Sequence, residues 1–470
     1  MSFSSRLLLL LALLSACVTP TPTLRSRARG RASTRDAVAP LAAAPLVSVT
    51  APGALAEVTV PAHVARALLP RHKVAGNLRN PRGLVRLPDG ALLVAEAGTG
   101  APDDLLSGGI VKLALGADGR FGERRLAQVL LAGQPSKNIL EIVRRDEVFG
   151  MGGMATGQGR VFASLAFFGG PSTVFALDGL DIETWTTTSM NINDLTYDAG
   201  RKRWFAVAST TDEIVELKQG RGSERVVKLL PLASGQDAVP AYLEHDPRTG
   251  ELLVSLFSGS PEGEEGGQGV ELVPRAGGIV AVDPDQKSVR WVVRGLSVPT
   301  DLQITSEGNL CVLEFCDAFL DPAASFEQLF AAPSHGGFRR FSGRLLFIDR
   351  VAKTTTVVAD GLDAPTNLLL ADGALYVAQG MGTPGRPIPI ASASAGRSAP
   401  SGARAKSRSA PSGARAKSRS APSGARAKSG AASVLARLSG SCVSRPDTVK
   451  NSAISITGVD TRCGRSPSCQ

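Results

Sequence analysis

The chain has 470 residues and a formal net charge of +10 at pH 7, and 43% of its residues are hydrophobic. The positive charge gathers near the two ends and in one basic repeat, which leaves the middle of the chain mildly acidic. The high charge therefore does not indicate a nucleic-acid-binding fold; it indicates basic segments suited to anionic surfaces. The motifs H-x-x-H and G-x-S-x-G and the phosphate-binding loop do not occur in the sequence.

Residues 1–17 read as a lipoprotein signal peptide. Arg6 precedes a short apolar run, and the run ends in Leu-Ser-Ala-Cys at Cys17. The run is too short to span a bilayer, and its ending resembles a bacterial lipobox. We expect lipidation of Cys17 and a lipid-anchored protein in the bacterial cell envelope, on the outer membrane or facing the periplasm. The alternative is an ordinary secretory signal with an incidental cysteine.

The sequence after the signal peptide divides into three parts. Residues 18–55 are rich in Pro, Thr, Ala and Arg without apolar periodicity, which predicts a disordered tether. Residues 56–440 carry the strand-like sequence and form the predicted folded domain, with a basic insertion at 383–430. Residues 441–470 form a cysteine-containing tail.

One pattern recurs through the folded domain: a short apolar strand, a turn built on Asp-Gly, Glu-Gly or Thr-Gly, and a second apolar strand. Gly supplies the positive φ of such a turn, and Asp stabilises it. Four clear copies and two degenerate ones occupy residues 80–98, 239–256, 298–314 and 364–379, and residues 154–165 and 193–208. Repeated hairpins separated by further strands are typical of a β-propeller. Because the copies are in phase, we expect an all-β, six-bladed β-propeller rather than a generic β-sandwich.

The sequence between the hairpins predicts the outer strands and the closure of the ring. Third strands are expected at residues 108–115, 277–284 and 343–350, and fourth strands at residues 288–296 and 354–362. Residues 72–78 look like a fourth strand that precedes its own blade, and residues 432–438 are the last good strand. We expect these two segments to pair in blade six, so that an N-terminal strand closes the ring and removes an open sheet edge.

A low-complexity segment interrupts blade six. The motif R-S-A-P-S-G-A-R-A-K-S occurs three times in tandem, starting at Arg397 and ending at Ser429. Small residues, Pro and regular positive charge cannot build a core, so we expect a long basic arm outside the propeller. Two interpretations remain open: the arm contacts anionic cell-envelope polymers, or it is a tolerated product of DNA slippage.

Six cysteines include Cys17, which leaves five. Cys311 and Cys316 are five residues apart in blade five, so a bridge between them requires a bulge or turn. The tail contains Cys442, Cys463 and Cys469, and a Cys463–Cys469 or Cys442–Cys463 disulfide would suit an exported protein. Zinc is a poor alternative, because the tail has neither His nor C-x-x-C.

The central channel is where propellers usually place their sites. In the first strands, the residues before the aligned Leu or Met are Gly83, Gly153, Asp194, Tyr242, Asp301 and Asn367. In the second strands, the polar residues at the aligned end position are Glu96, Glu314 and Gln379, on blades that become neighbours when the ring closes. We expect these three to converge near Asp301 and Asn367 and to bind a hard cation such as Ca²⁺. The alternative is hydrogen bonding to backbone and water.

The blocks N-P-R-G-L…P-D-G-A-L-L-V-A-E-A-G-T-G, V-P-T-D-L…E-G-N-L-C-V-L-E and A-P-T-N-L…A-D-G-A-L-Y-V-A-Q resemble the ScyD/ScyE family of exported, NHL-like β-propellers. The resemblance covers residues 72–380 and the closing strand. The lipobox and the basic repeat depart from the family's pattern. The family implies a propeller whose biochemical activity is not established, and we transfer no pigment-related role from it.

Three classes of function follow from these observations. A membrane-anchored binding or scaffold module of unknown ligand, not an enzyme, needs no catalytic residues and fits every feature. A metal-dependent, gluconolactonase-like hydrolase would use the acidic and amide residues of the channel. A quinone-dependent sugar dehydrogenase would need a His in the channel. The sequence places the four His residues in the predicted tether, clasp and loops: His63, His72, His245 and His335.

Overall fold

The computed structural model describes residues 57–139, 147–166, 171–233, 235–257, 273–317, 334–335, 338–381 and 433–439. These residues all belong to one compact unit, Ser48–Gln470. They form strands and one short 3₁₀ helix, η1 (Arg124–Leu126), and they contain no α-helix. Within these ranges no helix is therefore long and apolar enough to cross a membrane.

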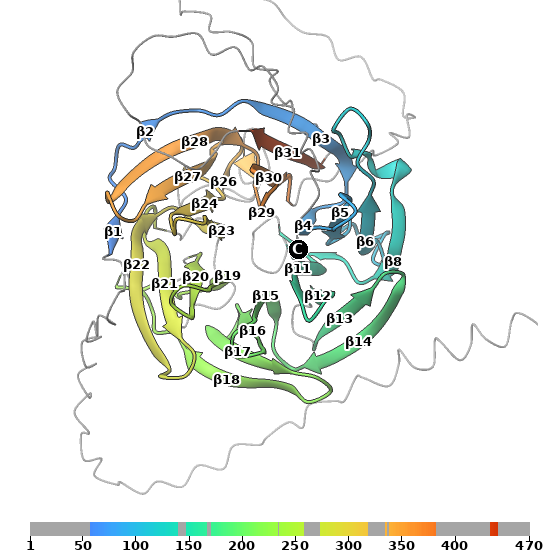
Figure 1. The fold of residues 1–470 in the computed structure, drawn as a ribbon, viewed down its shortest axis with the longest axis horizontal. Coiled ribbons are helices and arrows are strands. Elements are labelled where there is room, and N and C mark those ends of the chain that lie inside the picture. Colours follow the sequence, from blue (N-terminus) through green and yellow to red (C-terminus); the bar gives the residue numbers. More distant parts are fainter. Residues whose placement is uncertain are drawn as a thin grey trace, which may run out of the picture. The chain divides into compact units, whose positions relative to one another are not determined.

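Six antiparallel four-stranded units form the blades of a propeller (Figure 1). Blade 1 contains β4 (Pro81–Arg86), β5 (Leu92–Glu96), β6 (Gly108–Leu113) and β8 (Gln128–Gln134). Blade 2 contains β11 (Met151–Gly157), β12 (Arg160–Leu165), β13 (Ser172–Asp178) and β14 (Asp181–Thr188). Blade 3 contains β15 (Ile192–Asp198), β16 (Arg203–Ala208), β17 (Glu213–Lys218) and β18 (Gly222–Lys228).

The second half of the ring follows the same plan. Blade 4 contains β19 (Pro240–Asp246), β20 (Glu251–Leu256), β21 (Gly277–Asp283) and β22 (Ser288–Leu296). Blade 5 contains β23 (Pro299–Ile304), β24 (Leu310–Glu314), β27 (Gly343–Asp349) and β28 (Thr354–Leu362). Blade 6 contains β29 (Asn367–Ala371), β30 (Ala374–Gln379), β31 (Ser433–Ser439) and β3 (Arg71–Leu78). The predicted third and fourth strands are confirmed.

Two small sheets lie beside the blades. They are β9 (Lys137–Asn138) with β10 (Val148–Phe149), and β25 (Ser334–His335) with β26 (Phe338–Arg339).

The ring closes through blade 6, as the sequence predicts. β31 pairs antiparallel with both β30 and β3, so one late strand and one early strand complete this blade. The short β7 (Gly122–Glu123) of blade 1 adds to the outer edge of β3 in parallel. The innermost strands contact one another in the cyclic order β4, β11, β15, β19, β23, β29 and back to β4.

The N-terminal segment also covers two other blades, which the sequence does not predict. β1 (Val58–Thr59) adds in parallel to β22 of blade 4, and β2 (Ala65–Arg66) adds in parallel to β28 of blade 5. The chain therefore passes along the outside of blades 4 and 5 before it becomes the fourth strand of blade 6. These two additions cover the outer edges of blades 4 and 5.

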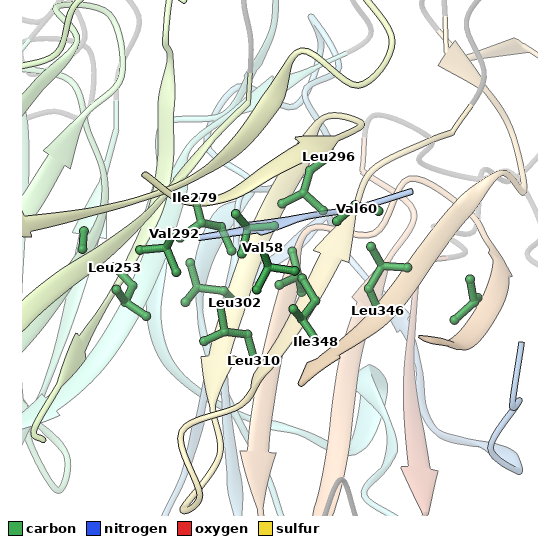
Figure 2. Close-up of a cluster of buried hydrophobic side chains, with 14 residues drawn as sticks. Val58, Val60, Leu253, Ile279, Val292, Leu296, Leu302, Leu310, Leu346 and Ile348 are labelled. Atoms are coloured by element: carbon green, nitrogen blue, oxygen red, sulfur yellow. The ribbon is translucent and has the colours of Figure 1, made fainter. Parts of the chain in front are cut away.

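In the described residues, six hydrophobic clusters lie one at each interface between neighbouring blades, and a seventh surrounds Phe315. Figure 2 shows the cluster between blades 4 and 5, where Leu253 and Ile279 meet Leu302 and Leu346. The N-terminal segment contributes Val58 and Val60, which are 1% and 0% exposed. A fully buried Val or Leu stabilises the fold by roughly 1.5–3 kcal/mol. The alternating apolar residues of each strand thus bury one face against each neighbouring blade.

The start of each clear hairpin copy has a distinctive backbone. The residue before the Pro adopts φ of 51°, 43°, 50° and 43° at Asn80, Val239, Val298 and Ala364, respectively. In each of these blades its carbonyl oxygen accepts a hydrogen bond from a backbone N–H that lies one or two residues after the end of the second strand. This left-handed conformation is rare for residues other than Gly, above all for Val. Its recurrence directs the chain into the innermost strand at equivalent places in four blades.

Candidate functional site

The innermost strands surround a cavity of about 570 Å³. Every blade contributes to its lining, from β4, β11, β15, β19, β23 and β29. Polar lining residues come mainly from blades 3–6, whereas blades 1 and 2 contribute Val85, Met154 and Ala155 among others. The lining from blades 1 and 2 is therefore mostly apolar, with Arg86 and Thr156 as its polar members.

The position before the aligned Leu does face the neighbouring innermost strand, as the alignment implies. Asp194 on β15 accepts a hydrogen bond from the backbone N–H of Leu243 in the next blade, at 3.1 Å. Asp301 on β23 accepts one from Leu368 N–H at 2.6 Å, again in the next blade. These carboxylates thus join consecutive blades at the axis while they line the cavity.

The structure brings together two of the predicted site residues, Asp301 and Asn367. The Asn367 side-chain amide donates to Asp301 Oδ2 at 2.7 Å, and Leu302 N–H donates to Asp301 Oδ1 at 2.7 Å. The other side-chain atom of Asn367, Oδ1, is buried and has no hydrogen-bond partner. Asn367 is only 7% exposed, so this oxygen is an unsatisfied acceptor at the wall of the cavity.

Glu244 is the most important cavity residue that the sequence alignment missed. It lies two residues after Tyr242 on β19 and receives only a long hydrogen bond, 3.4 Å, from Gln303 Nε2. Burial, together with the negative charges of Asp194 and Asp246, raises the pKa of Glu244 to about 8. The signal was present in the sequence, because residues i and i+2 of a strand share a face.

The other two channel carboxylates are perturbed in the same direction. Burial raises the pKa of Asp194 to about 7, although two backbone N–H groups oppose the shift. Burial and the charge of Asp194 raise the pKa of Asp301 well above its ordinary value. Asp194 and Glu244 therefore exchange protons near neutral pH, and clusters of carboxyl groups with raised pKa values mark candidate functional sites.

His245 also lines the cavity, which corrects its sequence assignment to a loop. It is the sixth residue of β19. Its Nε2 lies 3.4 Å from Asp198 Oδ1 on the neighbouring innermost strand. Burial lowers the pKa of His245, and Asp198 opposes that shift. A His beside a carboxylate therefore lies at the end of β19 that leads into the hairpin turn.

The expected convergence of Glu96, Glu314 and Gln379 is not what the contacts show, and this part of the prediction is corrected. Each side chain accepts a hydrogen bond from a backbone N–H just before the first strand of its own blade. The donors are Arg79 to Glu96 at 2.9 Å, Ser297 to Glu314 at 2.7 Å, and Asp363 to Gln379 at 3.0 Å.

Each of the two glutamates also pairs with an arginine. Arg124 donates to Glu96 at 2.7 Å, and Arg344 donates to Glu314 at 2.7 Å. Both glutamates are 0% exposed. The physical reason for the correction is that the last residue of the second strand turns toward the loop that precedes β4, β23 or β29. Strand parity alone does not reveal that turn.

No group of three or more His, Cys, Asp or Glu side chains is arranged to hold a metal ion in the part of the chain that the structure describes. The geometry therefore gives no support to a five-residue calcium site built from both sets of residues. Cys17, the arm from Arg397 to Ser429, and Cys442, Cys463 and Cys469 lie outside the described residues. Cys311 and Cys316 are both buried, and they belong to different hydrophobic clusters.

No protein-family model and no curated protein matches the chain. Solved structures similar to it include a protein of unknown function from Bacteroides thetaiotaomicron, with a TM-score of 0.41 and 11% identity over 67% of this chain and 74% of that one. Another is a putative oxidoreductase (glucose dehydrogenase) from Thermus thermophilus, with a TM-score of 0.37 and 15% identity over 66% and 94% of the two chains.

A third similar structure is virginiamycin B lyase from Staphylococcus aureus, with a TM-score of 0.37 and 7% identity over 67% and 96% of the two chains. The structural neighbours are β-propeller proteins. At these levels of similarity their activities do not transfer. The chain is a six-bladed β-propeller with a polar central cavity.

Proposed function

We propose that the chain is a ScyD/ScyE-type propeller that binds a small ligand in its central cavity, and that a lipid on Cys17 anchors it at the outer face of a bacterial membrane. The observation that carries the binding role is the cavity itself: about 570 Å³, reached by the innermost strand of every blade. This volume falls within the usual range for small-molecule sites. A binding or scaffold role requires no catalytic constellation.

The binding role is tested by filling the cavity. Ala155 lines the cavity and is half-buried, so Ala155→Leu places a larger side chain there. We expect native mass spectrometry of protein purified from its own membrane to detect a small molecule on the wild type and none on Ala155→Leu. Ala199→Leu, on an exposed turn, is the matched control and retains the molecule. Equal occupancy of all three proteins would contradict a channel site.

The anchor is tested separately. The sequence places Cys17 at the end of a lipobox, so Cys17→Ala removes the lipid attachment point. We expect the variant to leave the detergent-rich phase in a phase-partitioning assay, or to remain unprocessed. Unchanged partitioning of the processed variant would contradict lipidation.

The basic arm gives this module a second proposed contact, with anionic cell-envelope polymers. The support is its regular positive charge between Arg397 and Ser429. Deletion of residues 397–429 is expected to abolish salt-sensitive binding to anionic vesicles. Binding that survives the deletion would assign the interaction elsewhere and favour the slippage interpretation.

A further inference from the structure

The cavity wall gathers acidic side chains from three consecutive blades. Asp194 on β15, Glu244 on β19 and Asp301 on β23 all line it. No Lys or Arg forms an ion pair with any of the three within the described ranges. A positive ligand would therefore meet acidic groups that no Lys or Arg already pairs, and it would favour their ionised form.

The two arginines that line the same cavity are already engaged. Arg86 pairs with Asp372 at 2.9 Å, and Arg248 pairs with Asp246 at 2.7 Å. Neither neutralises the three channel carboxylates. The cavity thus combines an acidic wall with cations that are held at its rim by other partners.

A second observation points to a ligand that donates hydrogen bonds. Asn367 Oδ1 is an acceptor without a partner on a side chain that is 93% buried, and Glu244 has only one long hydrogen bond. Asn367 is fixed by its amide, which donates to Asp301. Because that amide nitrogen is the bound end, the oxygen is the end left for another donor. An unsatisfied buried acceptor is costly unless a ligand or water supplies that donor.

We infer that the cavity binds a small organic ammonium ion, with Glu244 and Asn367 as its direct acceptors and Asp194 and Asp301 as flanking charges. This inference rests on the proposed function, because it names the ligand class of the same cavity. An ammonium group donates up to three hydrogen bonds to separate acceptors. The apolar residues of blades 1 and 2, such as Val85 and Ala155, face the hydrocarbon part.

An ammonium ion fits this wall better than a bare metal ion. Calcium requires six to eight oxygens within about 2.3–2.6 Å of one point. Asp301 already accepts hydrogen bonds from Leu302, Leu368 and Asn367, and no three acidic or His side chains form a metal cluster in the described part of the chain. Donors on an ammonium group reach acceptors that are too dispersed to share one metal.

The raised pKa values of Glu244 and Asp194 supply an independent signature. A bound cation favours the ionised carboxylates, so binding near pH 7 releases protons, and affinity rises from pH 6 to pH 9. An alkylammonium with a pKa of about 10 remains charged over this range. The other charged or titratable groups on the surrounding elements include Arg82, Arg86, Glu147, Tyr197, Asp198, Tyr242, His245, Asp246, Arg248, Asp301 and Asp372.

The test is calorimetric titration of the detergent-solubilised full chain. The probes are putrescine, n-butylammonium and phenethylammonium, each compared with its hydroxyl isostere, and Ca²⁺ alone. We expect at least one ammonium probe to bind, its isostere to bind at least about tenfold more weakly, and the binding heat to depend on the buffer's ionisation enthalpy.

Two variants locate the site. Glu244→Gln and, independently, Asn367→Leu are expected to weaken ammonium binding by about tenfold or more, whereas the exposed Asp178→Asn leaves it unchanged. Having two variants keeps the test decisive if one fails to fold. Equal binding of the isosteres, no binding of any ammonium probe, or unchanged affinity in both variants overturns the inference.

Two further outcomes separate this inference from the proposed function. If a neutral or anionic molecule is found on the wild type and is lost from Ala155→Leu, the channel remains a binding site, but the ammonium assignment is overturned. If Ca²⁺ binds and Glu96→Gln with Glu314→Gln abolishes it, the calcium prediction from the sequence replaces the ammonium assignment.

Discussion

Two sets of buried carboxylates in this propeller differ in how their charge is satisfied. Glu96 and Glu314 each combine an arginine with a backbone N–H and are 0% exposed. Asp194 and Glu244, at the channel, have no arginine or lysine partner among the described residues. Both sets lie on the repeated hairpins: the glutamates of the first set end the second strand, and the carboxylates of the second set lie within the first strand.

Burial raises the pKa values of both sets of carboxyl groups, but different groups oppose that shift in each set. Burial raises the pKa of Glu96 and Glu314, but Arg124 and Arg344 oppose the shift. For Asp194 only backbone hydrogen bonds oppose burial, and for Glu244 nothing does. The paired glutamates hold the chain where it enters the innermost strand. The unpaired carboxylates are costly to folding, which is typical of groups retained for a ligand.

The largest expected effect comes from breaking a paired carboxylate. Glu314→Leu leaves the Arg344 guanidinium and the Ser297 N–H without their main acceptor, so we expect the free energy of unfolding to fall by about 3–5 kcal/mol. Glu244→Gln, which removes an unpaired charge, is expected to change it by no more than about 1 kcal/mol. Urea unfolding followed by Trp fluorescence measures both. Similar losses of unfolding free energy in the two variants would contradict the distinction between carboxylates that are paired with arginine and those that are not.

A smaller loss of stability is expected from filling the space beside Asp194. A Cβ added to Gly153 would lie 2.9 Å from the Cα of Asp194 and would overlap its carboxylate. We expect Gly153→Ala to lower the free energy of unfolding by about 1–3 kcal/mol, a typical cost of overpacking. Gly200→Ala, on an exposed turn, is the control and stays within about 0.5 kcal/mol.

The same substitution in an Asp194→Ala background separates the two contacts. Part of the cost disappears if the carboxylate is the main obstacle, because only the backbone contact remains. An unchanged cost would place the strain entirely on the backbone. A Gly153→Ala variant as stable as the wild type would show that the channel carboxylate is free to move.

The sequence predicts the fold well because the fold is periodic. Each hairpin copy repeats the same alternation and turn, so blade number, outer strands and the pairing of β3 with β31 follow from register. The additions of β1 and β2 are different. Each pairs over only two residues, in parallel and far away in sequence, and two residues carry no readable period.

The site is less accessible to sequence reasoning, and the reasons are local. Aligning one position identifies Asp194, Asp301 and Asn367 at the axis, because equivalent residues of a repeat occupy equivalent places. The alignment misses Glu244 because it covers one position of each first strand, and Glu244 occupies the next position on the same face of β19. For Glu96 the alignment finds the correct position in the repeat but not the direction of the side chain. An arginine and a loop N–H determine where its carboxylate points.

The pH dependence of stability gives the most specific test of the comparison. Unfolded Asp and Glu titrate near about 3.9 and 4.3, whereas the folded pKa values of Asp194 and Glu244 are about 7 and about 8. Between these limits the folded state holds protons that the unfolded state has released. Stability is therefore fully present below about pH 4 and is lost as pH rises through the folded values.

The measurement compares unfolding free energies of the wild type and Asp194→Asn/Glu244→Gln from pH 5 to pH 8.5. The wild type is expected to lose stability relative to the double variant as pH rises. Taking this difference cancels His245, whose lowered pKa acts in the opposite direction below about pH 6.5. A parallel pair of curves would mean that water in the cavity already satisfies these carboxylates, and the unpaired set would then be no costlier to folding than the paired one.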